Sequence, residues 1–201
     1  MSQKPVTRLS IVRREEKEAK LREFVLGHVG SMQPVETGAS CLLIARSADS
    51  PVAKTVLSMG AKASLRGFAV RAIFAYLGTA ETARVAEACR VSDWALQIRW
   101  ARDLRLLDAH EQLVLGPSTA WVGDCMRREP ASRDACELFA SDCTETARRA
   151  AVFFERLWQA SEPIFERAGT AEIAPVQPLL GQPVEQLGAI DPAKAPSRTS
   201  V

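Results

Sequence analysis

The residues with the greatest capacity for chemistry lie in one short stretch of the chain: His110, Gln112, Asp124, Arg127 and Arg128. An imidazole can act as a nucleophile or carry a proton near neutral pH. Two neighbouring guanidinium groups can bind a phosphate or a carboxylate through paired hydrogen bonds. We therefore take His110 and Gln112 as candidate catalytic residues, and the other three as a candidate ligand-binding group.

The local pattern places these residues on a hairpin and on the loop that follows it. Residues 110–115 and 119–122 are predicted as two strands, because the Gly-Pro-Ser sequence between them is typical of a tight turn. His110 opens the first strand, and the second strand ends just before Gly123. The hairpin would thus bring the histidine close to the loop that carries the two arginines.

This segment resembles the signature of the phospholipase D superfamily: His-x-Lys, four residues, Asp, six residues, then Gly-Ser/Gly-x-Asn. The resemblance covers about residues 36 to 165 and includes one copy of the motif. It implies a histidine nucleophile that forms a phospho-enzyme, with the lysine and asparagine holding the phosphate oxygens. It also implies a homodimer, because members with one motif commonly pair so that the second histidine serves as acid.

Only some positions of that signature are present in this chain. His110 matches the nucleophile and Gly123 matches the glycine. The other positions depart from the pattern: Gln112 for the lysine, Gly116 or Pro117 for the aspartate, Asp124 for the serine and Met126 for the asparagine.

These departures all weaken phosphate chemistry. Gln112 can donate a hydrogen bond but carries no charge, and charge-assisted bonds are roughly twice as strong as neutral ones. Met126 has no strong donor. A carboxylate at Asp124 would repel a phosphate by about 4 kcal/mol at ~4 Å and an effective dielectric of about 20. We therefore predict a degenerate phospholipase-D-like protein without phosphodiesterase activity, acting as a scaffold or as a module that binds a phosphate-containing or acidic ligand.

Other interpretations of the same residues stay open. The chain could be an active phosphodiesterase or nuclease, with His110 as nucleophile and the arginines replacing the lost donors. Asp124 could instead pair with these arginines and simply hold the loop in place, which is the interpretation we favour. A Cys125–His110 pair would need a lowered thiol pKa. An adaptor that uses the two ends of the chain is a further possibility.

Hydrophobic periodicity predicts the elements that must position this site. Residues 41–45 and 68–76 read as parallel strands joined by a helix over 52–65, and the first strand is apolar enough for burial on both faces. The other predicted elements are helices over 8–27, 81–90 and 132–160 and a strand over 96–100. The expected fold is α/β, a layered mixed sheet flanked by helices, as in a phospholipase-D-like half-domain.

Composition sets limits on the rest. The chain has 201 residues, 47% of them hydrophobic, and a net charge of +2, which does not favour a nucleic-acid partner although it does not exclude one. No apolar run is long enough to span a membrane, and nothing directs the chain out of the cytoplasm. Five cysteines without a CxxC pair and two histidines argue against a metal site, and no cofactor is expected.

We expect three segments along the chain. Residues 1–35 would form a charged amphipathic helix and loop, and residues 36–168 the phospholipase-D-like domain. Residues 169–201 contain five of the eleven prolines and no aromatic residue, so they are expected to be a disordered tail.

Overall fold

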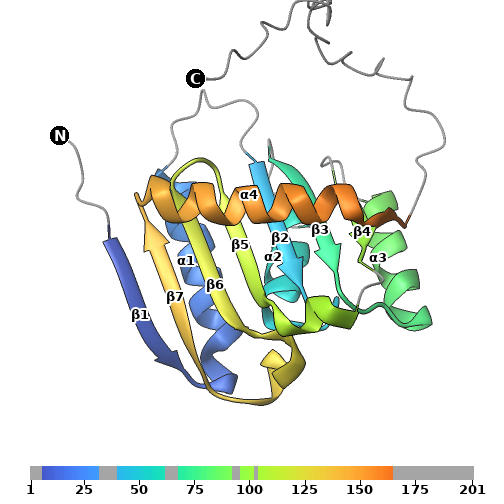
Figure 1. Ribbon diagram of the computed structural model, residues 1–201, viewed down its shortest axis with the longest axis horizontal. Coiled ribbons are helices and arrows are strands. Elements are labelled where there is room, and N and C mark those ends of the chain that lie inside the picture. The colour runs from blue at the N-terminus through green and yellow to red at the C-terminus, as the bar shows by residue number, and fades with distance from the viewer. Residues whose placement is uncertain (1–5, 32–39, 62–67, 92–95, 102–103, 165–201) are drawn as a thin grey trace, which may run out of the picture. The chain divides into compact units, whose positions relative to one another are not determined.

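The computed structural model describes residues 6–31, 40–61, 68–91, 96–101 and 104–164. These residues form one eight-stranded sheet with helices on both faces, as Figure 1 shows. The predicted fold class, a layered α/β domain with a mixed sheet, is confirmed.

The sheet combines a parallel portion with an antiparallel portion. Its strand order is β1-β7-β6-β5-β2-β3-β4-β8. Strands β2, β3 and β4 are parallel, and all other neighbours are antiparallel. The strands are β1 (Val6–Val12), β2 (Ser40–Ala45), β3 (Ala69–Phe74), β4 (Leu96–Trp100), β5 (His110–Leu115), β6 (Thr119–Cys125), β7 (Ala135–Ser141) and β8 (Glu162–Pro163).

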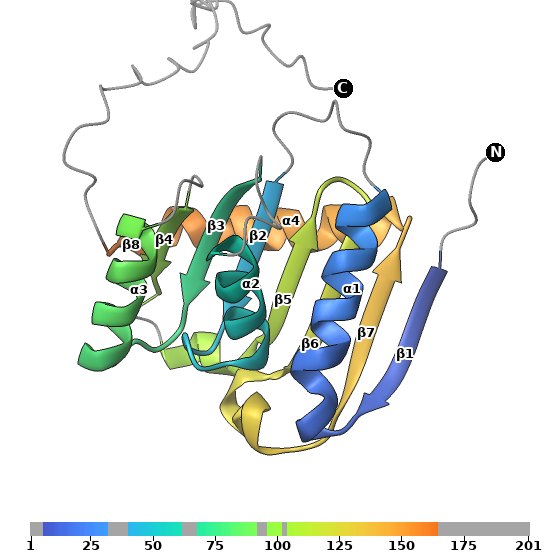
Figure 2. The ribbon, with the colours of Figure 1, turned by 180° about the vertical axis from the view of Figure 1, so that it is seen from behind.

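Three helices cover one face of the sheet and one helix crosses the other. Helices α1 (Lys17–Ser31), α2 (Pro51–Ala61) and α3 (Thr79–Val91) lie behind the sheet in Figure 1 and in front of it in Figure 2. Helix α4 (Thr144–Ala160) runs across the opposite face. The sheet therefore has two hydrophobic cores, one on each side.

Strand β2 contributes to both cores, as its apolar sequence predicts. Cys41 and Leu43 belong to the core on the α1–α3 side, whereas Leu42 and Ile44 belong to the core under α4. Successive side chains of a strand point to opposite faces, so a strand in the middle of a three-layer fold must be apolar at every position.

Helix α4 is held to the parallel strands by arginines as well as by apolar contacts. Arg71 of β3 lies 5.0 Å from the ring centre of Trp158, and Arg99 of β4 lies 4.7 Å from it. Arg71 also pairs with Glu155 of α4. A guanidinium over an indole face is attractive because the ring face is electron-rich, so the C-terminal half of α4 is well anchored.

The predicted helix over residues 8–27 is wrong for its N-terminal portion. Residues 6–12 form β1, which pairs along its whole length with β7, and α1 begins only at Lys17. Leu9 and Val12 fit the spacing of a helix, but the β-branched residues Val6, Ile11 and Val12 favour a strand. The strand forms because it pairs with the distant strand β7, and such long-range pairing leaves no trace in local periodicity.

The predicted helix over residues 132–160 is also wrong for its N-terminal portion. Residues 135–141 form β7, and α4 starts at Thr144. Asp142 adopts a positive φ of 54°, which ends the strand and turns the chain before the helix. Ala135, Glu137 and Phe139 lie on one face of β7, and Leu138 and Ala140 lie on the other, where they are half-buried and fully buried. Apolar residues on both faces also fit the spacing of a helix.

The remaining predicted elements agree in type with the structure, with ends that differ by a few residues. Strand β1 joins the sheet and helix α1 packs against α2, although both come from the leading segment predicted over residues 1–35. The predicted tail over 169–201 lies outside the described residues, and the division into three segments stays a prediction. No helix among the described residues is long and apolar enough to cross a bilayer.

Candidate functional site

His110 lies at the end of the sheet formed by the carboxyl ends of strands β2 and β3. It begins β5, which is antiparallel to β2, and its side chain is exposed. Its Nδ1 is 2.8 Å from the carbonyl oxygen of Gly123. A carbonyl oxygen can only accept, so Nδ1 carries the proton and Nε2 is the nitrogen left for chemistry.

A bulge beside His110 shapes the second strand. His110 is opposite Cys125, but Gln112 is opposite Val122, so Gly123 and Asp124 face a single residue of β5. This extra residue turns the Asp124 side chain inward, where its Oδ1 accepts a bond of 2.7 Å from the backbone nitrogen of Cys125. The bulge therefore brings Asp124 into the neighbourhood of His110.

Gly123 is required by its neighbour Trp121. A Cβ atom at position 123 would overlap the indole ring of Trp121, which is buried on the α1 side of the sheet. The glycine matched by the motif thus has a packing reason that is independent of catalysis.

The arginines around His110 are paired one to one with carboxylates. Arg128 lies 3.7 Å from Asp124, and Arg46 lies 3.0 Å from Glu129. Arg127 forms an ion pair with Asp108, which lowers the pKa of that carboxyl group through a hydrogen bond. The charges of these three arginines and three carboxylates balance at this end of the sheet.

Arg46 is a site residue that sequence reasoning missed. It directly follows β2 and its guanidinium donates to the carbonyl oxygen of Met126 as well as to Glu129. The position of Arg46 after a fully apolar strand was the available signal, because ligand sites of α/β sheets form at the carboxyl ends of parallel strands.

The two positions that should supply donors to a phosphate do not do so. Met126 is fully buried in the core under α4. The Oε1 atom of Gln112 is buried and has no hydrogen-bond partner among the described residues. Gln112 therefore presents an unsatisfied acceptor where the motif has a cation.

Cys125 lies opposite His110 but does not hydrogen-bond to it. Its Sγ donates to the backbone oxygens of Leu107 at 3.4 Å and Asp108 at 3.6 Å. The thiol proton is thus directed to the backbone and not to the imidazole, and this geometry argues against a Cys125–His110 pair.

A buried charged cluster lies beneath the loop after β6. The Nζ atom of Lys17 is 3.2 Å from Oε1 of Glu137 and donates to the carbonyl oxygen of Pro130 at 2.8 Å. Trp121 donates to the other oxygen of Glu137 at 3.0 Å. Lys17 and Glu137 are each 1% exposed, so this cluster fixes the loop from its inner side.

Glu111 is a second buried carboxyl group in this region. It is 1% exposed and accepts a bond of 2.9 Å from the backbone nitrogen of Arg46, which joins β5 to the loop after β2. Burial raises the pKa of Glu111 to about 7, although bonds from Ser50 and Arg46 oppose the shift.

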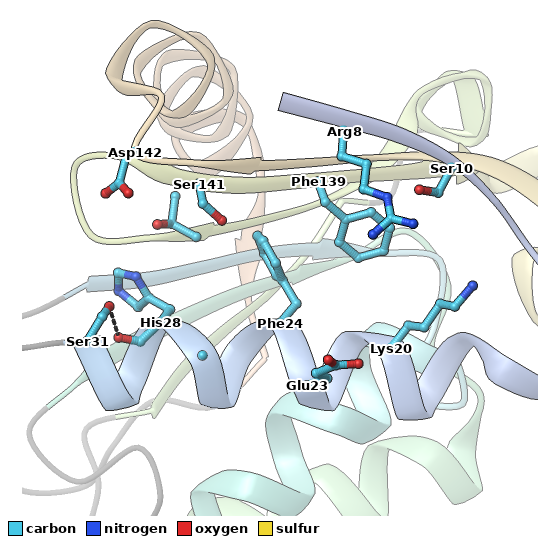
Figure 3. A pocket seen from close by; sticks show the side chains of 12 residues that line it. Arg8, Ser10, Lys20, Glu23, Phe24, His28, Ser31, Phe139, Ser141 and Asp142 are labelled. Atoms are coloured by element: carbon cyan, nitrogen blue, oxygen red, sulfur yellow. Dashed lines mark hydrogen bonds between the residues drawn. The ribbon is translucent and has the colours of Figure 1, made fainter. Parts of the chain in front are cut away.

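The described residues contain a cavity of about 510 Å³ elsewhere, between α1 and strands β1 and β7. Figure 3 shows Phe24 in its middle, with Arg8 and Lys20 on one side and His28 and Asp142 on the other. None of the five predicted site residues lines it. Among the residues that the structure describes, no three His, Cys, Asp or Glu side chains are grouped so that they could hold a metal ion.

Solved structures share this fold. The chain is similar to Nuc from Salmonella typhimurium, a phospholipase D family member, with 14% identity over 80% of this chain and 98% of that one and a TM-score of 0.52. It is also similar to TrmBL2, an archaeal chromatin protein reported to show a novel mode of DNA binding. That match has 12% identity over 77% of this chain and 54% of the other, with a TM-score of 0.51. No family model matches the chain, and no curated protein sequence does.

The Lys17–Glu137 pair should be essential for stability. Lys17→Ala leaves the buried carboxyl group of Glu137 without its counter-ion and the carbonyl oxygen of Pro130 without its donor, which should lower the free energy of unfolding by about 3–5 kcal/mol. Lys20→Ala is the matched control, because the exposed pair between Lys20 of the same helix and Glu16 just before it should contribute less than about 1 kcal/mol. Urea unfolding of both variants measures the difference, and equal effects would contradict a structural role for the buried pair.

Glu111 should make stability depend on pH. The folded protein holds the Glu111 proton up to pH 7, whereas the unfolded chain releases it near its ordinary pKa of 4.5. Stability contributed by this group is therefore complete below pH 4.5 and lost as the pH rises to 7, by on the order of 3 kcal/mol. Glu111→Gln should flatten urea-derived stability between pH 5 and pH 8, while Glu145→Gln, at an exposed site, should leave the slope as it is. An unchanged slope in Glu111→Gln would refute this assignment.

Proposed function

We propose that this chain is a phospholipase-D-like domain that has lost phosphodiester hydrolysis and works as a homodimeric scaffold in the cytoplasm. It would also bind a phosphate-containing or acidic ligand weakly at Arg127 and Arg128. The observation that carries this proposal is the one-to-one pairing of arginines and carboxylates around His110.

This pairing leaves little positive charge for a phosphate. A transferring phosphoryl group develops negative charge on its oxygens, and catalysis depends on fixed donors that stabilise that charge. Here Arg128 faces Asp124 and Arg127 faces Asp108. Loss of a single such donor typically costs about two to three decades in rate, and this site has no positive charge at Gln112 and no strong donor at Met126.

Ligand binding at the arginines is still compatible with this geometry. The side chains of Arg127 and Arg128 are each 61% exposed, and the Arg127–Asp108 pair is exposed on both sides, whereas Asp124, the partner of Arg128, is only 9% exposed. Exposed pairs contribute about 0–1 kcal/mol, and an anionic ligand could replace a carboxylate at small cost. Any such binding should be weak and should fall with salt concentration.

One observation favours the alternative, an active phosphodiesterase or nuclease. The bond from Nδ1 of His110 to Gly123 leaves Nε2 as the ring nitrogen outside that bond, which is the arrangement that a histidine nucleophile needs. Under this alternative, Arg46 and Arg128 would take the places of the missing donors after releasing Glu129 and Asp124.

Assays with model phosphodiesters and with DNA separate the two proposals. We expect no turnover above that of His110→Ala, and no phosphohistidine on His110 in mass spectra of protein quenched during incubation. Turnover that disappears in His110→Ala, or an adduct on His110, would establish the enzyme and refute the scaffold. The matched variant His28→Ala controls for loss of a histidine elsewhere in the fold.

Removal of the carboxylate beside His110 should improve anion binding. Asp124→Asn takes away one negative charge and frees Arg128, so inorganic phosphate should bind about tenfold more tightly, equivalent to about 1.4 kcal/mol. Glu145→Gln is the control, because it frees Arg148 and Arg149 at a site remote in sequence from the motif. Titration followed by calorimetry measures both, and equal affinities in Asp124→Asn and the parent chain would refute the role of Asp124.

A further inference from the structure

Strand β1 leaves one edge of the sheet open. It is the last strand in the order and pairs with β7 only, so the hydrogen-bonding groups on its outer side meet no other strand of the described residues. The strand is seven residues long, and its side chains include Leu9 at 67% and Ile11 at 77% exposure. A long open edge with exposed apolar side chains is usually protected in natural proteins, because it pairs readily with other strands.

The two faces of β1 differ in character. Arg8 lies opposite Phe139, which packs against the α1-side core, so Arg8 and Ser10 are on that face and line its cavity. Leu9 lies opposite Leu138 and therefore points to the α4 side, together with Thr7 and Ile11. Leu9 and Ile11, the most exposed apolar residues of β1, therefore both lie on the α4 side of the sheet.

We propose that the outer edge of β1 is the surface through which two copies of this chain pair. A two-fold axis perpendicular to the sheet places β1 antiparallel to β1 of the partner subunit and continues the sheet across both copies. The inference rests on the homodimer of the proposed function.

The sequence of β1 is self-complementary in one register. With the axis at Leu9, all seven residues pair: Leu9 with its own copy, Arg8 with Ser10, Thr7 with Ile11 and Val6 with Val12. Apolar and β-branched residues then face one another on the α4 side, and each such cross-strand pair is stabilising.

The single charge of the strand selects this register from its neighbours. An axis at Arg8 would place the two arginines directly opposite one another, and like charges in that position are destabilising. An axis at Ser10 leaves Val6 and Thr7 without partners within the strand. Only the axis at Leu9 uses the whole strand and separates the two arginines.

This arrangement keeps the two His110 sites apart. Each β5 is separated from its own β1 by β6 and β7, so the two β5 strands lie on the order of 34 Å apart at the usual strand spacing. It thus differs from the pairing that the motif resemblance implies, in which two motif segments face one another. Neither copy could supply an acid to the His110 of the other.

Sedimentation equilibrium of the full chain tests the interface. We expect a dimer that Leu9→Asp weakens at least tenfold, because two carboxylates would then lie opposite one another. Phe153→Asp, at an exposed apolar position of α4, is the matched control and should leave the dimer unchanged. Ser10→Asp should strengthen association about threefold to tenfold, since each aspartate would face Arg8 of the partner subunit.

A cross-link tests the register and guards against misfolded variants. Leu9→Cys should form an intermolecular disulfide between the two substituted positions under mild oxidation, because directly opposite residues lie within disulfide range. Phe153→Cys should not. A chain that stays monomeric at all concentrations would overturn both the homodimer and this interface. A dimer that is insensitive to Leu9→Asp and Ser10→Asp would overturn the interface alone.

Discussion

The candidate site depends on the contacts that the buried carboxylate of Glu137 makes. One of its oxygens meets Lys17 of α1 and the other accepts from Trp121 of β6. The position of the Trp121 ring requires glycine at 123, and the carbonyl of Gly123 holds the Nδ1 atom of His110. A single buried ion pair therefore links the first helix, through three residues, to the orientation of the exposed histidine.

Burial gives this ion pair its importance and also makes it costly. Moving two charges out of water costs several kcal/mol per ion, and the attraction between them compensates only when every remaining polar atom has a partner. Lys17 meets this condition by donating also to Pro130, which lies in the loop that carries the arginines. The pair consequently defines a unique position for the loop rather than simply adding stability, since other loop positions would leave a charge unpaired.

The extent to which sequence could predict this structure follows from the range of the interactions involved. The apolar strand at 41–45, the parallel unit after it and the hairpin at 110–122 depend on local patterns, and all three were predicted. β1 and β7 pair with each other across most of the chain, so local periodicity predicts helix for both. Lys17 and Glu137 could not be recognised for the same reason. A lysine within a run of charged residues is expected in water, and only the pairing of β7 shows which face its glutamate occupies.

Two positions of the motif segment, Gly123 and Met126, serve packing. Met126, at the position of the motif asparagine, packs into the core under α4 and so contributes apolar contact where a donor would have faced solvent. Gly123 leaves room for the ring of Trp121. Of the two motif positions that match, Gly123 therefore has a packing role, whereas His110 is exposed.

The pairing of β1 with β7 also has a consequence for synthesis of the chain. Val12 at the end of β1 pairs with Ala135, so the first strand to leave the ribosome must wait for the seventh before it has a neighbour. Contacts between distant segments form late in folding. During that interval both edges of β1 are without a neighbouring strand.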